Sequence, residues 1–354
     1  MNTKDIPVVL LLAAASVLVL WLRAPSMFRY RFSPALIERY ERSQDIPHEV
    51  RNRVFLSDSD IHIAAGYLYT GGFSPESFNF QHPPLIKYLF GWSTRLTGSP
   101  FTVQILLAAL FVSLSYAFAR RSLDIVPAAA AAGLILIDPV FVDVSSQALL
   151  DLGQSVCAVA YVLVATTMPG AWVFAGILLG LFAASKFWTT ACLFYLAVTG
   201  YQIWLRKMSY RTAVLTGLVA CATFAAVYAR AFAAHGGFFN IVFFQLKLLK
   251  YWLHHSVTSM PAASVILFLT GYVWEWWGAH TWVRAQVWTP VWPAALACSL
   301  FTPRTAVHLF IVGMPLVFLA YLGAQAPFTR YFLIILPFLY TGFIMSVLNA
   351  IRKR

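Results

Sequence analysis

Two aspartates, a histidine and a lysine lie close together in one stretch of the chain, from Ser57 to Gly91. A carboxylate within hydrogen-bond reach can take a proton from an attacking hydroxyl group. A fixed cation can stabilise the negative charge that grows on a leaving group. The residues are Asp58, Asp60, His82 and Lys87. They predict a functional site, and the plain alternative is a solvated loop between two hydrophobic segments.

The composition places this stretch in a membrane protein. The chain of 354 residues is 60% hydrophobic and 11% charged, with a mean hydropathy of +0.73. Soluble globular chains carry about 25% charged residues. The net charge of +12 raises nucleic acid binding as a function, but the Lys and Arg residues cluster at the ends of hydrophobic segments, as in membrane proteins. We therefore expect an all-α polytopic membrane protein that does not bind nucleic acid.

Hydrophobic windows predict about ten transmembrane helices in one transmembrane domain over residues 1–354, without a separate soluble domain. We interpret the first helix as a retained anchor. The short apolar run 85–97 contains Lys87 and Arg95, which favours a helix along the membrane surface. The four cysteines lie in apolar runs without metal-binding spacing. The expected spans are 6–22, 101–119, 124–141, 147–168, 170–185, 187–205, 212–232, 288–302, 305–322 and 331–350.

Basic clusters predict the orientation of these spans. With the N-terminus inside, all of the main clusters fall on the cytoplasmic side: Arg120–Arg121; Arg206, Lys207 and Arg211; Arg304; and Arg352–Arg354. Two long external segments then remain, at about 23–100 and about 233–287. The second contains an amphipathic helix pattern, NIVFFQLKLLKYWLHH, and an apolar run at 261–273 whose crossing of the membrane is left open. This orientation collects the candidate site residues on the outer side: Asp58, Asp60, His82, Lys87, Asp151, Lys186 and Arg330.

Four motifs in series carry a family resemblance. They are Asp58 followed by His82-Pro83-Pro84-Leu85-Ile86-Lys87; IDPVFVDVSSQALLD, ending at Asp151; GLFAASKFWTT, with Lys186; and FTRYFLIILPFLY, with Arg330. The set resembles the dolichyl-phosphate-mannose protein O-mannosyltransferases and their bacterial relative, the lipid A aminoarabinose transferase. Both are GT-C membrane glycosyltransferases. The resemblance implies a GT-C fold with juxtamembrane helices in the first external segment.

The resemblance also implies an activity. The protein would be a hexosyl- or mannosyltransferase that moves a sugar from a polyprenyl (dolichyl-type) phosphate donor to a hydroxyl group. The acceptor would be a protein or a glycolipid on the extracytoplasmic face of the cell membrane. Asp58 or Asp60 would be the general base, and His82, Lys87, Asp151, Lys186 and Arg330 would bind substrate. The lipid tail needs an apolar groove, which the Phe- and Trp-rich second external segment could wall.

Three departures from the family pattern limit the transfer of roles. Ser59 replaces the usual glutamate, Ser146 replaces an arginine expected to contact phosphate, and the β-trefoil domain of eukaryotic members is absent from the second external segment. Asp58-Ser59-Asp60 is formally a DxD sequence, which oxygen-seeking cations favour. We expect no obligatory metal cofactor, with a divalent cation at Asp58 and Asp60 as the alternative.

Each candidate residue also has a structural interpretation. Asp58 suits a helix N-cap, and Asp60 suits the first helical turn. Lys87 and Lys186 can extend to lipid headgroups. Two other functions stay open at this point. A transporter or lipid flippase for a glycolipid would place charges along a translocation path, and a membrane scaffold would leave the acidic loop unexplained.

Overall fold

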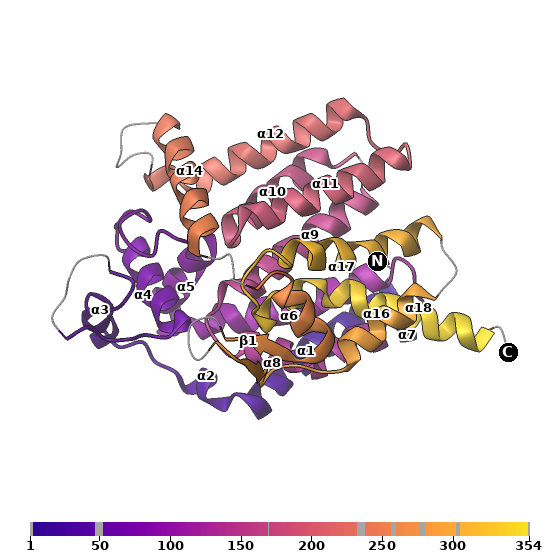
Figure 1. The fold of residues 1–354 in the computed structure, drawn as a ribbon, viewed down its shortest axis with the longest axis horizontal. Helices are drawn as coiled ribbons and strands as arrows, with labels where there is room; N and C mark the ends of the chain where they lie inside the picture. Colours follow the sequence, from indigo (N-terminus) through magenta and orange to yellow (C-terminus); the bar gives the residue numbers. More distant parts are fainter. Residues whose placement is uncertain are drawn as a thin grey trace. The chain divides into compact units, whose positions relative to one another are not determined.

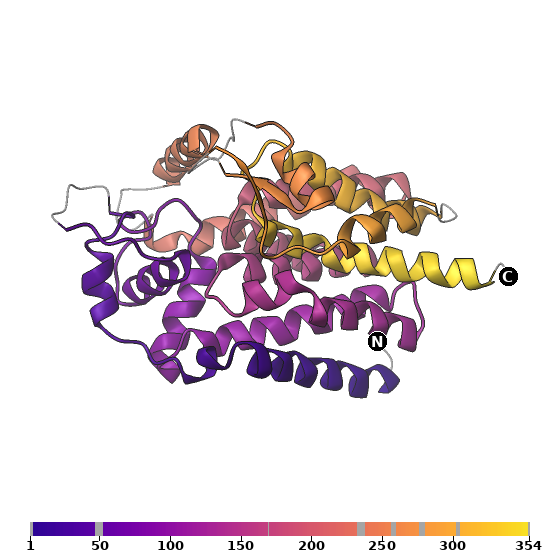
Figure 2. The same cartoon turned by 60° about the horizontal axis from the view of Figure 1, so that its bottom comes forward.

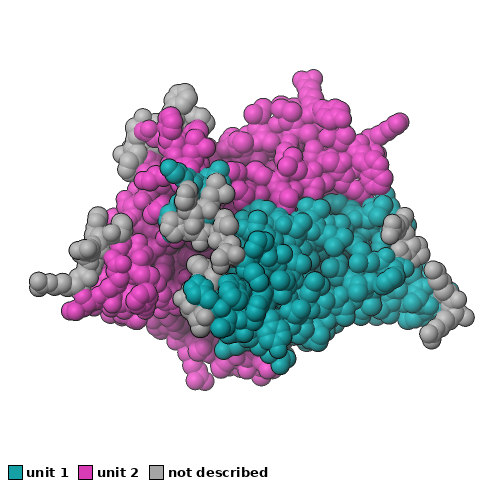
Figure 3. All heavy atoms as spheres, in the orientation of Figure 1, with its two compact units in different colours: residues 1–19, 109–143, 249–354 teal, residues 20–108, 144–248 magenta. Residues whose placement is uncertain are grey.

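The high apolar content agrees with the structure, since the described residues are mostly helical in the computed structural model (Figure 1). The structure describes residues 3–46, 52–168, 170–231, 238–255, 260–275, 280–301 and 305–352. Arg304, Lys353 and Arg354 of the predicted basic clusters lie outside these residues. The chain divides into two compact units (Figure 3). Unit 1 comprises Met1–Val19, Ala109–Asp143 and Leu249–Arg354, and unit 2 comprises Leu20–Ala108 and Val144–Leu248.

The predicted all-α polytopic membrane fold is confirmed, whereas the number of ten spans stays a prediction. In the described part of the chain, five helices are long and apolar enough to cross a membrane: Thr3–Arg23, Phe101–Ala119, Leu150–Thr167, Tyr210–Val227 and Thr329–Arg352. A sixth span results if Ile125–Ile137 and Pro139–Ser145, which meet at a bend of 61°, count as one. Three further apolar helices are shorter: Trp172–Ser185, Val291–Leu300 and Ala306–Leu322.

Unit 2 begins with a series of short helices in the first external segment. These are α2 (Pro25–Arg29), α3 (Ala35–Tyr40), α4 (Asp58–Thr70) and α5 (Leu85–Thr97). α4 and α5 pack together through two glycines, because a Cβ atom on Gly66 would overlap the carbonyl oxygen of Lys87, and one on Gly91 would overlap that of Gly66. The two helix backbones are therefore in direct contact, and they hold the first and last parts of the functional stretch together.

The remaining helices of unit 2 form a bundle around α10 (Trp172–Ser185). α10 packs against α9 (Leu150–Thr167), α11 (Trp188–Trp204) and α12 (Tyr210–Val227). Gly176 and Gly180 allow the close approach to α12, since Cβ atoms there would lie 2.8 Å from the carbonyl oxygen of Thr216 and 2.5 Å from that of Ala220. Small residues four apart are typical of helix contacts in membranes. The amphipathic pattern of the second external segment forms α14 (Phe238–His255), as predicted.

In unit 1, α18 (Leu336–Arg352) packs against α7 (Ile125–Ile137), α16 (Val291–Leu300) and α17 (Ala306–Leu322) (Figure 2). The unit also contains the first part of α1 (Ile6–Arg23), α8 (Pro139–Ser145), and the short η1 (Thr3–Asp5) and η2 (Thr329–Ile335). α6 (Phe101–Ala119) is shared between the two units. Asp138 follows the last residue of α7 and caps α8, because its carboxylate accepts from the Val140 amide at 2.9 Å. The same carboxylate accepts from the Trp292 indole at 2.7 Å, which links this bend to α16.

The apolar run at 261–273 forms a helix that is too short to cross a membrane. α15 (Ala263–Thr270) has eight residues, which rise about 12 Å, against a hydrocarbon thickness of about 30 Å. It ends at Gly271, which has a φ of +77°. β1 (Tyr272–Trp274) follows and pairs with β2 (Trp282–Arg284) in an antiparallel hairpin. This segment therefore adds no span to unit 1.

Candidate functional site

The two aspartates lie in the first turn of α4, and Ser57 caps that helix. The Ser57 hydroxyl accepts from the backbone amide of Asp60 at 3.1 Å, so the alternative of Asp58 as the N-cap is wrong. Each residue of an α-helix turns by about 100°, so Asp58 and Asp60 point about 160° apart. No group of three or more His, Cys, Asp or Glu side chains that could hold a metal ion occurs among the described residues. A divalent cation at Asp58 and Asp60 stays a prediction.

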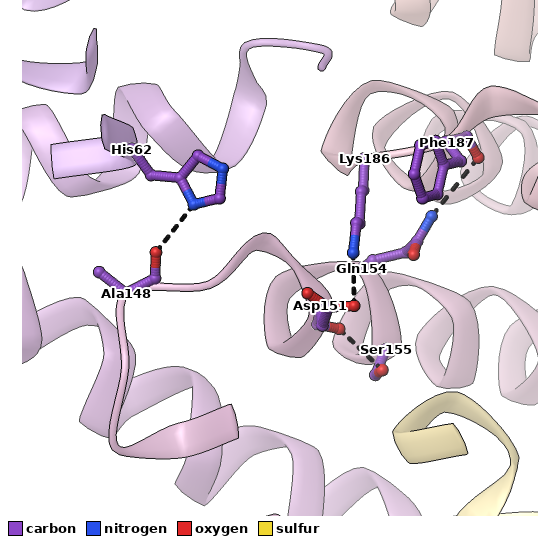
Figure 4. Close-up of polar contacts among 7 residues, drawn as sticks. All are labelled: His62, Ala148, Asp151, Gln154, Ser155, Lys186 and Phe187. Atoms are coloured by element: carbon purple, nitrogen blue, oxygen red, sulfur yellow. Dashed lines mark hydrogen bonds and ion pairs between the residues drawn. The ribbon is translucent and has the colours of Figure 1, made fainter. Parts of the chain in front are cut away.

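Residues on one side of α4 bind the peptide group of Ala148. The amide of Ala148 donates to the Ser59 hydroxyl at 2.9 Å, and its carbonyl oxygen lies 3.1 Å from His62 Nδ1 (Figure 4). Residues three or four apart share a helix face. Asp58 is therefore on the same flank as His62, and the docking brings that flank of α4 to the segment that leads into α9.

Asp60 lies on another side of α4, near Tyr30. Burial is the main reason that the pKa of the Tyr30 hydroxyl is raised, and the negative charge of Asp60 raises it further. Asp58 is exposed and Asp60 is partly buried. The sequence did not decide which of the two acids is the general base, and the structure shows that their surroundings differ.

Asp151 and Lys186 form a buried ion pair. Asp151 lies in the first turn of α9, and Lys186 follows the last residue of α10. Lys186 Nζ lies 2.5 Å from Asp151 Oδ1, and their side chains are 3% and 5% exposed (Figure 4). Two predicted substrate-binding residues are thus brought together. The low exposure excludes the alternative that Lys186 extends to lipid headgroups.

Neighbouring polar contacts fix both ends of this pair. The Ser155 hydroxyl donates to the Asp151 carbonyl oxygen at 2.8 Å. The Gln154 amide nitrogen donates to the carbonyl oxygen of Phe187 at 3.4 Å. The Lys186 ammonium also lies 5.1 Å from the centre of the Phe187 ring. One turn of α9 and the junction of α10 and α11 are therefore joined around the ion pair.

His82 connects α4 with that junction. Its ring centre lies 6.0 Å from that of His62 and 5.2 Å from that of Phe187. Both contacts are edge-to-face, which is a favoured aromatic geometry. The His-Pro-Pro motif thus lies between the helix that carries Asp58 and the residue that follows Lys186. The sequence analysis missed His62 and Phe187, although His62 is a polar residue within the apolar run 61–65 of α4.

Lys87 is turned into the protein. Its side chain is fully buried. Its ammonium donates to the carbonyl oxygens of Asn79 and His82, both at 2.7 Å, and to Asn79 Oδ1 at 2.9 Å. The Asn79 amide donates to Asp45 at 2.9 Å, and Asp45 accepts from the Tyr40 hydroxyl at 2.5 Å. These contacts exclude the lipid-headgroup alternative and support a positioning role. A contact of Lys87 with a lipid phosphate stays a prediction.

Burial also changes the acidity of this lysine. Burial lowers the pKa of Lys87 to about 7, and the negative charge of Asp45 opposes that shift. The ammonium has three hydrogens and the neutral amine has only two, so loss of the proton removes one donor from the oxygens that surround Nζ. The loop between α4 and α5 is therefore held by a group that titrates near neutral pH.

Arg330 belongs to unit 1, whereas the other six predicted site residues belong to unit 2. Its guanidinium lies 4.6 Å from the centre of the Phe328 ring and 6.0 Å from that of Tyr331. Both distances are typical of cation–π contacts. Its convergence with the site residues of unit 2 stays a prediction.

An apolar cavity lies in unit 2 among α10, α11, α12 and α14. Its volume is about 490 Å³. One of its walls is Trp188, two residues after Lys186, and α14 supplies Val242, Gln245 and Leu246. The second external segment therefore supplies part of an apolar wall, although the residues it contributes are Val242, Gln245 and Leu246 and not its Phe and Trp residues. Its role as a groove for a lipid tail stays a prediction.

Comparisons with known proteins agree with this architecture. Residues 81–229 match the family described as dolichyl-phosphate-mannose-protein mannosyltransferase. The structure is similar to that of ArnT from Cupriavidus metallidurans bound to undecaprenyl phosphate, with a TM-score of 0.62 and 16% identity, over 96% of this chain and 59% of that one. No curated protein matches the sequence.

A second similarity is to the oligosaccharyltransferase of Archaeoglobus fulgidus. The apo form gives a TM-score of 0.59 and 14% identity, over 100% of this chain and 52% of that one. The form tethered to an acceptor peptide with an NVT sequon gives 0.50 and 14%, over 98% and 50%. The chain thus spans about three fifths of ArnT and about half of the oligosaccharyltransferase.

Proposed function

Since the chain has the GT-C fold of membrane glycosyltransferases, as its sequence resemblance predicted, we propose that it transfers a sugar from a polyprenyl phosphate to a hydroxyl acceptor. The observation that carries the proposal is the linkage of Asp58 to the Asp151–Lys186 pair through the helix contacts of α4. His62 binds Ala148 three residues before Asp151, and His82 bridges His62 to Phe187 beside Lys186. A proton acceptor and a cation are thus positioned by one set of contacts.

Asp58 is the general base in this proposal. It is exposed and lies on the flank of α4 that contacts the segment before Asp151, whereas Asp60 lies near Tyr30. Asp58 takes the proton of the acceptor hydroxyl while the acceptor oxygen forms a bond to the anomeric carbon of the sugar. The bond between that carbon and the phosphate oxygen breaks, and the phosphate leaves with the electron pair.

Lys186 stabilises the leaving phosphate. Asp151 orients the ammonium at 2.5 Å, and the first turn of α9 adds the positive end of a helix dipole. The site is buried, which strengthens such electrostatic stabilisation. Arg330 is the second predicted phosphate contact, because its guanidinium suits bidentate binding of phosphate oxygens.

The apolar cavity holds the first part of the polyprenyl tail in this proposal. Trp188 lies two residues from Lys186 and lines the cavity, so the tail can enter it while its phosphate stays near the ammonium. The acceptor is a protein or glycolipid hydroxyl on the extracytoplasmic face. The peptide-tethered oligosaccharyltransferase supports a protein acceptor.

The test uses purified full-length protein in liposomes with an envelope extract as the source of acceptor. The measurement is the release of polyprenyl phosphate from synthetic polyprenyl-phosphate mannose or glucose. We expect wild-type release, a fall of about 10²- to 10⁴-fold in Asp58→Asn, and a change of less than about tenfold in the matched control Asp60→Asn. Thermal unfolding shows whether both variants fold.

Two results contradict this proposal at different levels. Full activity of folded Asp58→Asn removes the general-base role. Absence of release from both donors by the wild-type protein contradicts transfer from these polyprenyl-phosphate sugars. Mass spectrometry of envelope proteins and glycolipids, with and without the gene, then identifies the acceptor class.

A further inference from the structure

A second cavity lies in unit 1, where the turn between α6 and α7 meets the last turns of α18. Its volume is about 430 Å³. Both polar and apolar residues line it. The polar residues are Arg120, Arg121, Ser122, Asp124, Asn349 and Arg352, and the apolar residues are Leu123, Met345 and Leu348.

Arg120 is part of the frame of this cavity. Its Nε donates to Asp5 Oδ1 at 2.8 Å, and its Nη1 donates to the carbonyl oxygen of Leu123 at 2.6 Å. The Tyr116 hydroxyl donates to the same Asp5 oxygen at 2.8 Å. These contacts neutralise Arg120 and fix the shape of the turn.

The other two arginines supply the unbalanced charge. Arg121 and Arg352 are exposed, and neither forms an ion pair with another residue that the structure describes. Asp124 is the one acidic residue in the wall. A guanidinium presents a planar fork of donors that matches two oxygens of a phosphate group. The cavity therefore suits a ligand with a phosphate group.

The position of the cavity identifies the kind of phosphate compound. α6 ends at Ala119 and α18 ends at Arg352, and both belong to candidate membrane spans, so the cavity lies at span ends, where water meets lipid. Basic residues at span ends favour the cytoplasmic leaflet, which is rich in anionic lipids. The apolar side chains would make no favourable contact with a free inorganic ion, but they can pack against the glycerol and first methylene groups of a lipid.

We propose that this cavity binds the phosphodiester headgroup of an anionic membrane lipid. Arg121 and Arg352 hold the phosphate oxygens, and Leu123, Met345 and Leu348 contact the apolar part below the headgroup. The cavity is lined by residues of unit 1, whereas Asp58, Asp151 and Lys186 belong to unit 2. Each proposal is therefore tested on its own variants.

The experiment measures binding of phosphatidylglycerol to the delipidated full-length protein by native mass spectrometry, with phosphatidylcholine as the zwitterionic reference. We expect Arg121→Gln with Arg352→Gln to weaken phosphatidylglycerol binding by about tenfold or more. The matched control, Lys207→Gln with Arg211→Gln, removes one charge from the turn after α11 and one from the first turn of α12, and it leaves binding within about twofold. Asp124→Asn has the opposite effect and strengthens binding, because it removes a repulsive charge but keeps a good helix cap.

Tighter binding by Asp124→Asn cannot result from misfolding of that variant, so it tests the charge effect independently of the double variant. Three results overturn the proposal. In the first, both double variants lose binding equally, which indicates general charge attraction. In the second, phosphatidylcholine binds as tightly as phosphatidylglycerol. In the third, inorganic phosphate at millimolar concentration displaces the lipid completely, which indicates a free-anion site.

Discussion

Lys87 and Lys186 are both buried lysines of unit 2, but their charges are balanced in different ways. The Lys87 ammonium is surrounded by carbonyl, amide and hydroxyl oxygens, and its nearest carboxylate, Asp45, is reached through Asn79. Lys186 contacts the carboxylate of Asp151 directly. The sequence analysis predicted that both bind substrate. The contacts instead suggest that one lysine holds a loop in shape and the other supplies charge to a reaction.

Replacement of Lys186 is expected to have the largest effect. Lys186→Met leaves the buried Asp151 charge without its cation, which costs about 3–5 kcal/mol of unfolding free energy, and it lowers transfer by about 100-fold or more. Lys186→Met combined with Asp151→Asn removes both charges and restores stability but not transfer. Thermal unfolding in detergent and the release assay measure the two effects. Recovery of transfer by the double variant would make the pair purely structural.

Replacement of Lys87 is expected to lower the stability of the protein more than it lowers the rate of transfer. Lys87→Met leaves the carbonyl oxygens of Asn79 and His82 buried without their donor, and each such loss costs about 1–3 kcal/mol. We expect a clear fall in the unfolding midpoint, with the donor KM changed by less than about threefold at a permissive temperature. A normal midpoint with a strongly raised donor KM would instead place Lys87 on the donor.

A smaller substitution, Gly91→Ala, perturbs the surroundings of Lys87 and leaves those of Lys186 unchanged. Gly91→Ala forces a Cβ atom onto the carbonyl oxygen of Gly66, and such overpacking costs about 1–3 kcal/mol. It disturbs the loop that Lys87 binds and leaves the Asp151–Lys186 pair in place. Gly200→Ala in α11 is the matched control, because a Cβ atom there meets no atom within 4 Å. Equal unfolding midpoints for the two variants would contradict the close contact of α4 and α5.

The last expected effect is a pH dependence. The folded-state pKa of Lys87 is about 7, below the ordinary lysine value of 10.5. Between these values the unfolded chain holds a proton that the folded chain has released, so unfolding takes up a proton and stability rises with pH. The unfolding midpoint of the wild type relative to Lys87→Met should therefore rise from about pH 7 to about pH 10. A constant difference would show that Lys87 keeps its proton throughout.

Composition and hydropathy predicted the class of fold because burial of apolar helices in a membrane depends on local sequence alone. The amphipathic α14 was predicted for the same reason. Helix lengths were harder, since α10 and α16 are shorter than a span. Their ends depend on packing and on turns such as the one at Pro290, which precedes α16 and which local hydropathy does not encode.

The candidate site was predicted only as a set of residue types. Asp151 and Lys186 are 35 residues apart, and the sequence placed both on one side of the membrane without pairing them. The Lys87 side chain points into the protein because it binds carbonyl oxygens of the loop between α4 and α5. The conformation of that loop cannot be predicted from a local sequence pattern. Helical geometry did separate Asp58 from Asp60 once it was known that α4 begins at Asp58, after its cap Ser57.

The contact of Gly66 with Gly91 limits how a substrate can enter. Two helices whose main chains are in contact cannot slide past each other or move apart at that point without breaking the contact. We therefore expect α4 and α5 to move as one rigid body. We expect a bulky lipid to be admitted by displacement of some other wall, with the acids and the His-Pro-Pro motif keeping their mutual spacing. Cross-linking these two helices should therefore leave turnover intact.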